Sequence, residues 1–181
     1  MRATPPKLPL PDASPRPAAL ANATDDLKLS NQLCFATYAA AHAFTRVYKP
    51  LLDPLGLTYP QYLVLLVLWE QENVTVREIG ERLYLDSATL SPLLKRLETA
   101  GLVRRTRDAR DERQVRITLT EAGRGLKGPV RQAWDRVVCA VGLPEAEFES
   151  LKRQLYQLRE TLEASVTGAD GAAPDRGREA G

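Results

Sequence analysis

The chain has 181 residues, of which 44% are hydrophobic and 27% are charged, and its formal net charge at pH 7 is +2. This length is sufficient for one sizeable hydrophobic core. A single histidine and two cysteines, without paired Cys or His at metal-ligand spacing, exclude a zinc or iron site. The sequence also contains neither a glycine-rich phosphate loop nor a nucleophile elbow. We therefore expect no metal, no cofactor and no enzymatic activity that depends on these devices.

The two ends of the chain differ in composition from the middle. Residues 1–24 are rich in Pro and Ala and contain no continuous apolar run, which predicts neither a signal peptide nor a membrane span. Residues 167–181 are rich in Gly, Ala, Asp and Arg without apolar periodicity. We expect two disordered tails around one folded domain at residues 25–166, in a cytoplasmic protein. Thiols stay reduced in that compartment, so the two cysteines predict no structural disulfide framework.

The first predicted helix runs from Leu29 to about Tyr48, with Ser30 as a candidate N-cap. Cys34 falls in its first turns, where the unpaired amide groups and the helix dipole favour the thiolate, the reactive form of cysteine. The local sequence by itself favours a different interpretation, in which Cys34 is a small buried hydrophobic side chain. The helix alone does not decide between a reactive and an inert cysteine.

Two further helices have well-marked beginnings. Thr58 and Gln61 form a capping box at the start of a second helix, and Thr75 and Glu78 form another at the start of a third. The third helix is short and is followed by a turn at residues 84–86. It is therefore predicted to be the first helix of a helix-turn-helix unit.

The helix predicted for residues 87–100 is the candidate DNA reader. Its apolar stripe consists of four leucines at helical spacing: Leu90, Leu93, Leu94 and Leu97. Gly101 stands where a glycine in the left-handed conformation ends a helix. The polar side chains lie mostly off the stripe and are predicted to face the DNA: Ser87, Thr89, Ser91, Lys95 and Arg96.

Two strands, residues 103–107 and 114–119, are predicted to flank a charged loop that resembles the wing of a winged helix-turn-helix. Residues 95–116 contain eight Lys and Arg against four Asp and Glu, a net charge of +4 in a chain whose total is +2. Such a basic patch is suited to phosphate attraction. The alternative is a solvated charged hairpin without a nucleic-acid partner. The residues assigned to the wing are the DNA-binding Arg107, Arg110 and Arg113 and the wing-structuring Asp108.

A fifth helix is predicted from Thr120 to Val141, with Cys139 near its end, and a sixth from Glu145. The sixth carries apolar residues spaced 3, 4, 3 and 4, the pattern of a pairing seam: Phe148, Leu151, Leu155, Leu158 and Leu162. The seam could pack on its own subunit, but an isolated winged helix reads few base pairs, which favours a dimer. Together the elements predict a mainly α fold with a small β-wing (α+β), a winged helix-turn-helix that dimerises through its N- and C-terminal helices.

With these elements in place, residues 26–166 resemble the MarR family of dimeric winged-helix transcription regulators, and within it the organic hydroperoxide resistance regulators. The resemblance rests on four motifs that occur in order: LSNQLCFATYAA, YKPLLDPLGLTYPQYLVLLVLWE, LYLDSATLSPLLKRLETAGLV and DARDER. The family's wing pattern of Asp, Arg and Arg is matched by Asp108, Arg110 and Arg113. The proline-rich N-terminal tail departs from the family pattern.

The resemblance implies a sensor cysteine at Cys34, a thiolate stabilised by hydrogen bonds from Tyr48 and Tyr59, and an intersubunit disulfide to Cys139. A phenolic O–H beside the sulfur would lower the pKa of the thiol, so the tyrosines have a chemical reason for their places. On this basis we expect a repressor that binds a palindromic operator in double-stranded DNA as a homodimer, without a membrane partner. Organic hydroperoxides are the expected inducers, because they would oxidise Cys34 and release the DNA.

Three other functions remain open at this point. The nearest is a MarR-type regulator that is gated by a small phenolic ligand and has inert cysteines. A thiol peroxidase would also carry a reactive cysteine, but it would leave the wing and the reading helix unexplained. A helical scaffold or nucleoid-type binder would explain the charge without sequence specificity.

Overall fold

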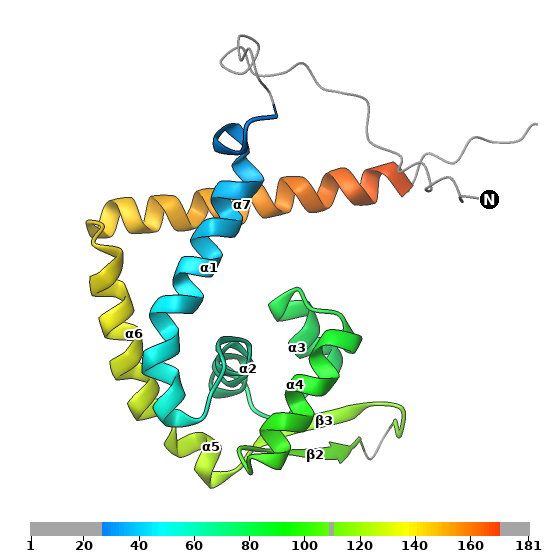
Figure 1. The fold of residues 1–181 in the computed structure, drawn as a ribbon. Coiled ribbons are helices and arrows are strands. Elements are labelled where there is room, and N and C mark those ends of the chain that lie inside the picture. Colours follow the sequence, from blue (N-terminus) through cyan, green and yellow to red (C-terminus); the bar gives the residue numbers. More distant parts are fainter. Residues whose placement is uncertain (1–26, 109–110, 171–181) are drawn as a thin grey trace, which may run out of the picture. The chain divides into compact units, whose positions relative to one another are not determined.

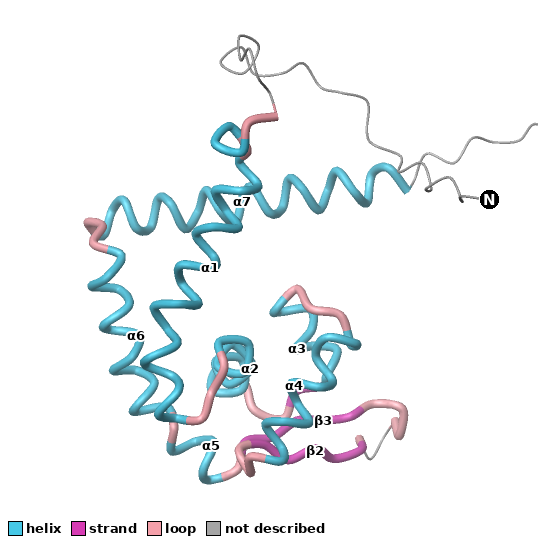
Figure 2. The backbone as a smooth tube through the Cα atoms, viewed as in Figure 1, coloured by secondary structure: helices cyan, strands magenta, loops and turns pink. Residues whose placement is uncertain are grey.

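The structure is a computed structural model that describes residues 27–108 and 111–170, and it divides into two units (Figures 1 and 2). The larger unit comprises residues 32–142. Its elements are α1 (Leu33–Leu52), the 3-10 helix η2 (Asp53–Leu55), α2 (Tyr59–Glu70), β1 (Val74–Thr75), α3 (Val76–Leu83), α4 (Ser87–Thr99), β2 (Val103–Arg107), β3 (Val115–Leu119), α5 (Glu121–Gly125) and α6 (Lys127–Val141). The other unit contains the 3-10 helix η1 (Leu29–Asn31) and α7 (Glu145–Asp170).

One small antiparallel sheet accompanies the helices, with the strand order β1-β3-β2. β2 and β3 form the predicted hairpin, in a register that pairs Val103 with Leu119 and Arg107 with Val115. β1 adds Val74 opposite Ile117 on the other edge of β3. The sequence did not predict β1, because two residues are too few for an alternating pattern to appear. The predicted fold class, mainly α with a small β-wing, is confirmed.

The core of the larger unit forms where α2, α3 and α4 each bury an apolar face against one another and against the sheet. Its largest fully buried side chains are Leu52, Val64, Leu65, Leu68, Val74, Ile79, Leu90, Leu94, Leu97 and Ile117. Both predicted capping boxes are present, because the Thr58 amide donates to Gln61 Oε1 at 2.8 Å and the Thr75 amide donates to Glu78 Oε2 at 2.6 Å. These boxes satisfy amide groups that would otherwise be unpaired at the starts of α2 and α3.

The first helix differs from the prediction at both ends. It begins at Leu33 with Gln32 as its N-cap, and the segment that holds Ser30 forms the separate 3-10 helix η1. It also continues past Tyr48, through Pro50, to Leu52. Proline in a helix interior removes one hydrogen bond, but Tyr48 and Leu52 are buried in the core on either side of it. Packing therefore outweighs the local preference for ending the helix.

The predicted fifth helix is in fact two helices, α5 and α6, which are separated at Leu126. Gly123, Gly125 and Gly128 weaken the helix around this point. Pro129 has no N–H to donate to the carbonyl of Gly125, yet it fits the first turn of a new helix. The break therefore follows from composition that the prediction had not weighed.

α7 begins at the predicted Glu145 and ends at Asp170, so residues 167–170, which were assigned to the C-terminal tail, are helical. Along its predicted seam, Leu151, Leu155 and Leu162 are all exposed in the single chain. The predicted tail at residues 1–24 and the last residues, from 171, lie outside the described residues.

Among the described residues no single helix is both long and apolar enough to span a membrane. By length and composition alone, the pair Leu33–Leu55 and Tyr59–Glu70 passes the test, with a bend of 74° between the two segments.

Gly123 marks the closest approach between α5 and the chain that enters the hairpin. A Cβ atom on Gly123 would lie 2.1 Å from the carbonyl oxygen of Leu102 and 3.1 Å from Cδ2 of Leu119. The carbonyl of Gly123 also accepts a hydrogen bond from Trp69 Nε1 at 3.0 Å. Only glycine therefore allows α5 to contact both α2 and the base of the hairpin.

We predict that Gly123→Ala lowers the free energy of unfolding by about 1–3 kcal/mol, the range for overpacked sites, because the new methyl group forces backbone apart. Gly128→Ala is the matched control, since a Cβ there meets nothing within 4 Å. It should leave stability unchanged or raise it by up to about 1 kcal/mol through helix propensity. Urea denaturation followed by circular dichroism measures both. Equal stabilities for the two variants would contradict the close approach.

Candidate nucleic-acid interface and redox site

The turn between α3 and α4 precedes α4, the candidate reader helix. Tyr84 closes α3 in the left-handed conformation, with φ of 56°. Asp86 is the N-cap of α4, and its Oδ1 accepts a hydrogen bond from the Thr89 amide at 2.6 Å. This bond holds the pKa of Asp86 below its ordinary value, because it stabilises the carboxylate. The sequence had placed Asp86 only in a turn, although Asp is a preferred N-cap residue.

α4 has one buried and one exposed side, as the sequence predicted. Its four stripe leucines are buried. The five polar residues assigned to DNA are all exposed: Ser87, Thr89, Ser91, Lys95 and Arg96. The Ser91 hydroxyl donates its proton to the Ser87 carbonyl at 2.6 Å, so in this conformation the hydroxyl can only accept a further hydrogen bond. The geometry therefore leaves a continuous polar face for a ligand outside the protein.

The wing between β2 and β3 is shaped by Asp111, which the sequence analysis did not single out. Its Oδ1 accepts from the Arg113 amide at 3.0 Å, and its Oδ2 accepts from the Gln114 side chain at 3.1 Å. Asp is favoured in such turns because its side chain can hydrogen-bond backbone two residues later. Arg107 and Arg113 are exposed, and Arg110 lies outside the described residues.

Asp108, the predicted wing-structuring residue, lies at the base of the wing and is only 8% exposed. Its amide donates to the Gln114 carbonyl at 3.0 Å, which closes the two ends of the wing loop against each other. Its carboxylate accepts a hydrogen bond from Arg116 of β3. The sequence analysis had counted Arg116 only as one charge in the basic patch.

Three tyrosines cluster where α1 ends and α2 begins. The ring of Tyr48 lies 5.1 Å from that of Tyr59 and 5.1 Å from that of Tyr62, between ring centroids. The pKa of Tyr59 is raised mainly by burial and to a smaller extent by the neighbouring Tyr48. Burial, followed by the hydrogen bond with Tyr48, raises the pKa of Tyr62. The phenols of Tyr59 and Tyr62 therefore stay protonated and can donate hydrogen bonds. The sequence analysis did not assign Tyr62 to the site.

A single chain does not bring Cys34 and Tyr48 together. Cys34 is the second residue of α1, and Tyr48 stands fourteen residues later in the same unbroken helix. At the rise of an α-helix the two are about 21 Å apart along its axis. Cys139 lies in the last turn of α6, which packs against α1. Both thiols are free and exposed.

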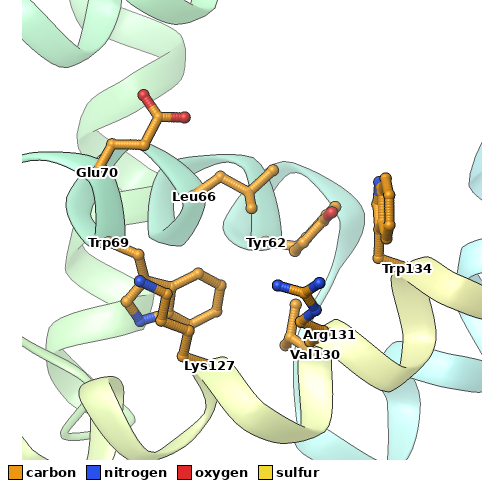
Figure 3. A pocket seen from close by; sticks show the side chains of 8 residues that line it. All are labelled: Tyr62, Leu66, Trp69, Glu70, Lys127, Val130, Arg131 and Trp134. Atoms are coloured by element: carbon orange, nitrogen blue, oxygen red, sulfur yellow. The ribbon is translucent and has the colours of Figure 1, made fainter.

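An open pocket lies between α2 and α6, with a volume of about 330 Å³ (Figure 3). Its walls are mostly aromatic and aliphatic: Tyr62, Leu66, Trp69, Val130 and Trp134. Glu70, Lys127 and Arg131 add charged groups. Because Tyr62 belongs both to this pocket and to the tyrosine cluster, the two are adjacent. Within the described ranges, no group of three or more His, Cys, Asp and Glu could hold a metal ion.

Comparisons with known proteins agree with this geometry. Residues 46–129 match the family described as transcriptional regulator SarA/Rot. The chain is 53% identical over 154 residues to the HTH-type transcriptional regulator TtmR of Methylorubrum extorquens, covering 85% of this chain and 79% of that protein. It is 52% identical over 144 residues to the organic hydroperoxide resistance transcriptional regulator of Bacillus subtilis, covering 78% and 96%. The chain belongs to the SarA/Rot/MarR-type family of winged-helix transcription regulators.

Solved structures of similar proteins include AbfR in a reduced, DNA-bound form and in a disulfide-formed state. The chain is 40% identical to AbfR of Staphylococcus epidermidis in its reduced, DNA-bound form, with a TM-score of 0.66 over 77% of this chain and 96% of that one. Against disulfide-formed AbfR the identity is 41% and the TM-score 0.54, over 74% and 94%. The chain is thus a DNA-binding transcription regulator, and its relatives are regulators rather than enzymes.

We predict that the stabilising effect of the Asp86 N-cap on this MarR-type regulator depends on pH. The carboxylate stabilises the fold fully above its unfolded-state pKa of about 3.9, and this contribution is lost as the pH falls through the lower folded-state pKa. Asp86→Asn keeps a capping oxygen but does not titrate. The melting temperature of the wild type should therefore exceed that of Asp86→Asn at neutral pH, and the difference should shrink in acid. A difference that stays constant across that range would contradict the assignment.

Proposed function

We propose that this regulator represses transcription as a homodimer on a palindromic operator and releases it when an organic hydroperoxide oxidises Cys34. The observation that carries the proposal is an exposed cysteine in the first turn of α1, in a chain 52% identical to the organic hydroperoxide resistance regulator of Bacillus subtilis. The setting is the cytoplasm, where the operator is accessible and the thiol stays reduced until it meets a peroxide.

The DNA interface consists of α4 in the major groove and the wing in the adjacent minor groove. The exposed polar face of α4 and the exposed Arg107 and Arg113 support this arrangement. Base contacts from α4 supply sequence specificity, while arginines of the wing, Arg110 included, supply electrostatic attraction. The reduced, DNA-bound form of the relative AbfR is similar in fold.

The dimer is supported by apolar side chains that the single chain leaves exposed. On α1 they include Leu33, Tyr38 and Phe44, and on α7 they form the seam that begins near Leu151. Helices with such faces bury them against a partner, and a twofold dimer presents two reader helices to two half-sites about one DNA turn apart. The exposed faces therefore fit a second copy of the chain.

The tyrosines that act on Cys34 come from the partner subunit. Cys34 and Tyr48 stand about 21 Å apart along one helix, which exceeds the reach of a hydrogen bond. Tyr59 contacts Tyr48, so it lies at the same distant end of α1. A phenolic O–H from the partner's Tyr48 or the partner's Tyr59 stabilises the thiolate by donating to it.

The chemical step is the attack of the Cys34 thiolate on the outer peroxide oxygen. The S–O bond forms as the O–O bond breaks, so sulfur is oxidised to a sulfenic acid and the peroxide is reduced to an alkoxide that takes a proton to become an alcohol. The protonated phenols are suited to donate to the departing oxygen. The pocket beside Tyr62, with Trp69 and Trp134 in its walls, accommodates the organic part of the peroxide (Figure 3).

A second thiol completes the switch. The Cys139 thiolate attacks the sulfenic sulfur, a disulfide forms and hydroxide leaves. A disulfide requires Cα atoms within about 7 Å, so its formation fixes α1 of one subunit and α6 of the other at that separation. The resulting movement changes the spacing of the reader helices and releases DNA. AbfR, with a disulfide-formed structure, supports the chemistry by analogy.

For the DNA interface, we predict that Arg113→Ala weakens operator binding. The slope of log K against log salt concentration should become shallower by about 0.9, the value for the loss of one phosphate contact. The measurement is fluorescence anisotropy on a duplex that the wild type selects from a random pool, repeated across salt concentrations.

Lys152→Ala on α7 is the matched control, because it removes one exposed positive charge from the other structural unit. It should leave both affinity and salt slope unchanged. If the salt dependence of operator affinity is the same in Arg113→Ala as in the wild type, the wing does not contact DNA phosphates as proposed.

For the redox site, mixed dimers test whether the tyrosines that act on Cys34 belong to the same chain or to the partner subunit. We predict that they belong to the partner subunit. One chain carries Cys34→Ser, and the other carries Tyr48→Phe together with Tyr59→Phe. If tyrosines act on the partner's cysteine, this dimer contains one complete site and its remaining Cys34 reacts with cumene hydroperoxide at the wild-type rate. If they act within one chain, both sites are damaged and the rate falls. Rates are read from mass spectrometry of trapped sulfenic acid.

The single cysteine variants separate the two chemical steps. Cys34→Ser should bind DNA and ignore peroxide. Cys139→Ser should still form the sulfenic acid but become over-oxidised more readily, and it should form no covalent dimer on a non-reducing gel. Release of DNA by wild type with Cys34 unmodified would reject the mechanism and favour gating by a small ligand.

A further inference from the structure

We propose that Arg116 is a positioning residue that fixes the wing to the helix-turn-helix and makes no contact with DNA phosphates. The proposal rests on the wing and α4 forming the DNA interface. Arg116 is the second residue of β3, the central strand, and lies opposite Thr75 of β1 and Thr106 of β2. It is therefore placed to join the two outer strands.

The guanidinium of Arg116 donates in two directions. Its Nε donates to Oδ2 of Asp108, at the base of the wing. Its Nη1 donates to the carbonyl of Asn73 at 2.8 Å, in the segment that precedes β1. Asn73 has a φ of 57°, so the carbonyl is presented by a backbone conformation that few residues adopt. A lysine has one compact ammonium group and does not reproduce this fork.

The buried carboxylate of Asp108 needs a countercharge, and Arg116 provides it. The side chain of Asp108 is only 9% exposed, and a buried carboxylate is costly unless a countercharge accompanies it. Arg116 supplies that charge from a side chain that is 35% exposed. The pKa of Glu78 lies below its ordinary value, mainly because its carboxylate accepts hydrogen bonds from the amide and the hydroxyl of Thr75. The positive charge of Arg116 makes a smaller contribution in the same direction. The field of Arg116 thus reaches the start of α3.

These contacts determine the direction in which the wing leaves the sheet. Asp108 closes the wing loop through its amide bond to Gln114, so holding its carboxylate orients both ends of the loop. The same guanidinium is bonded to the segment that leads into α3, the first helix of the helix-turn-helix. Arg116 therefore holds the wing at a set distance from the reader helix, and its charge is already neutralised within the protein.

The test is the affinity of Arg116→Met for the selected operator duplex, measured across salt concentrations. We expect affinity to fall by at least about tenfold, the factor that corresponds to one hydrogen bond to a charged group, with an unchanged salt slope. Arg116→Lys should recover part of the loss. Arg104→Met removes the same charge from the neighbouring strand and, as the matched control, should have a smaller effect.

A second variant separates positioning from folding. Arg116→Met leaves Asp108 as a buried charge, so the double variant with Asp108→Asn should recover thermal stability while its operator affinity stays low. A salt slope reduced by about one in Arg116→Met would make Arg116 a phosphate contact and overturn the proposal. Recovery of affinity together with stability would also overturn it. If Arg113→Ala has no effect on binding, the DNA interface itself fails, which is a separate result.

Discussion

The reading surface depends on one constraint, which is that α4 is fully buried on one side and fully hydrated on the other. Leu90, Leu94 and Leu97 have no solvent exposure and pack into the core shared with α2, α3 and the sheet. Each such leucine contributes about 1.5–3 kcal/mol through burial. Because the buried side supplies the apolar packing that holds the helix in place, the polar residues on the opposite side contribute little to stability. They are available for contact with DNA.

Local spacing was sufficient to predict much of this fold. The capping boxes at Thr58 and Thr75, the leucine stripe of α4 and the β2–β3 hairpin each depend on residues a few positions apart, so a sequence pattern contains them. The break between α5 and α6 also has a local cause, but two other elements that differed from the prediction depend on the rest of the chain. β1 exists because β3 offers it an edge, and α1 continues through Pro50 because Tyr48 and Leu52 are buried. No local pattern includes those partners.

The candidate site divides in the same way. Cys34, Tyr48 and the α4 residues were singled out from motifs, and the structure places Cys34 and the α4 residues on exposed surface. The pair of Asp108 and Arg116 required the strand register, which the sequence does not state. Tyr62 joined the tyrosine cluster through the packing of α2 on α1. The separation of Cys34 from Tyr48 follows from helix rise alone, and under the proposed function it makes the sensor a property of two chains.

The hydrogen bond from Ser91 to the Ser87 carbonyl bears on which bases α4 matches in the proposed complex. Because its proton is committed, the Ser91 oxygen only accepts, and the acceptor-seeking groups in the major groove are the amino groups of adenine and cytosine. Lys95, one turn later, only donates, which suits guanine O6 and N7 or thymine O4. In the proposed complex, Ser91 therefore matches an amino group on a base edge and Lys95 matches a carbonyl or N7 acceptor.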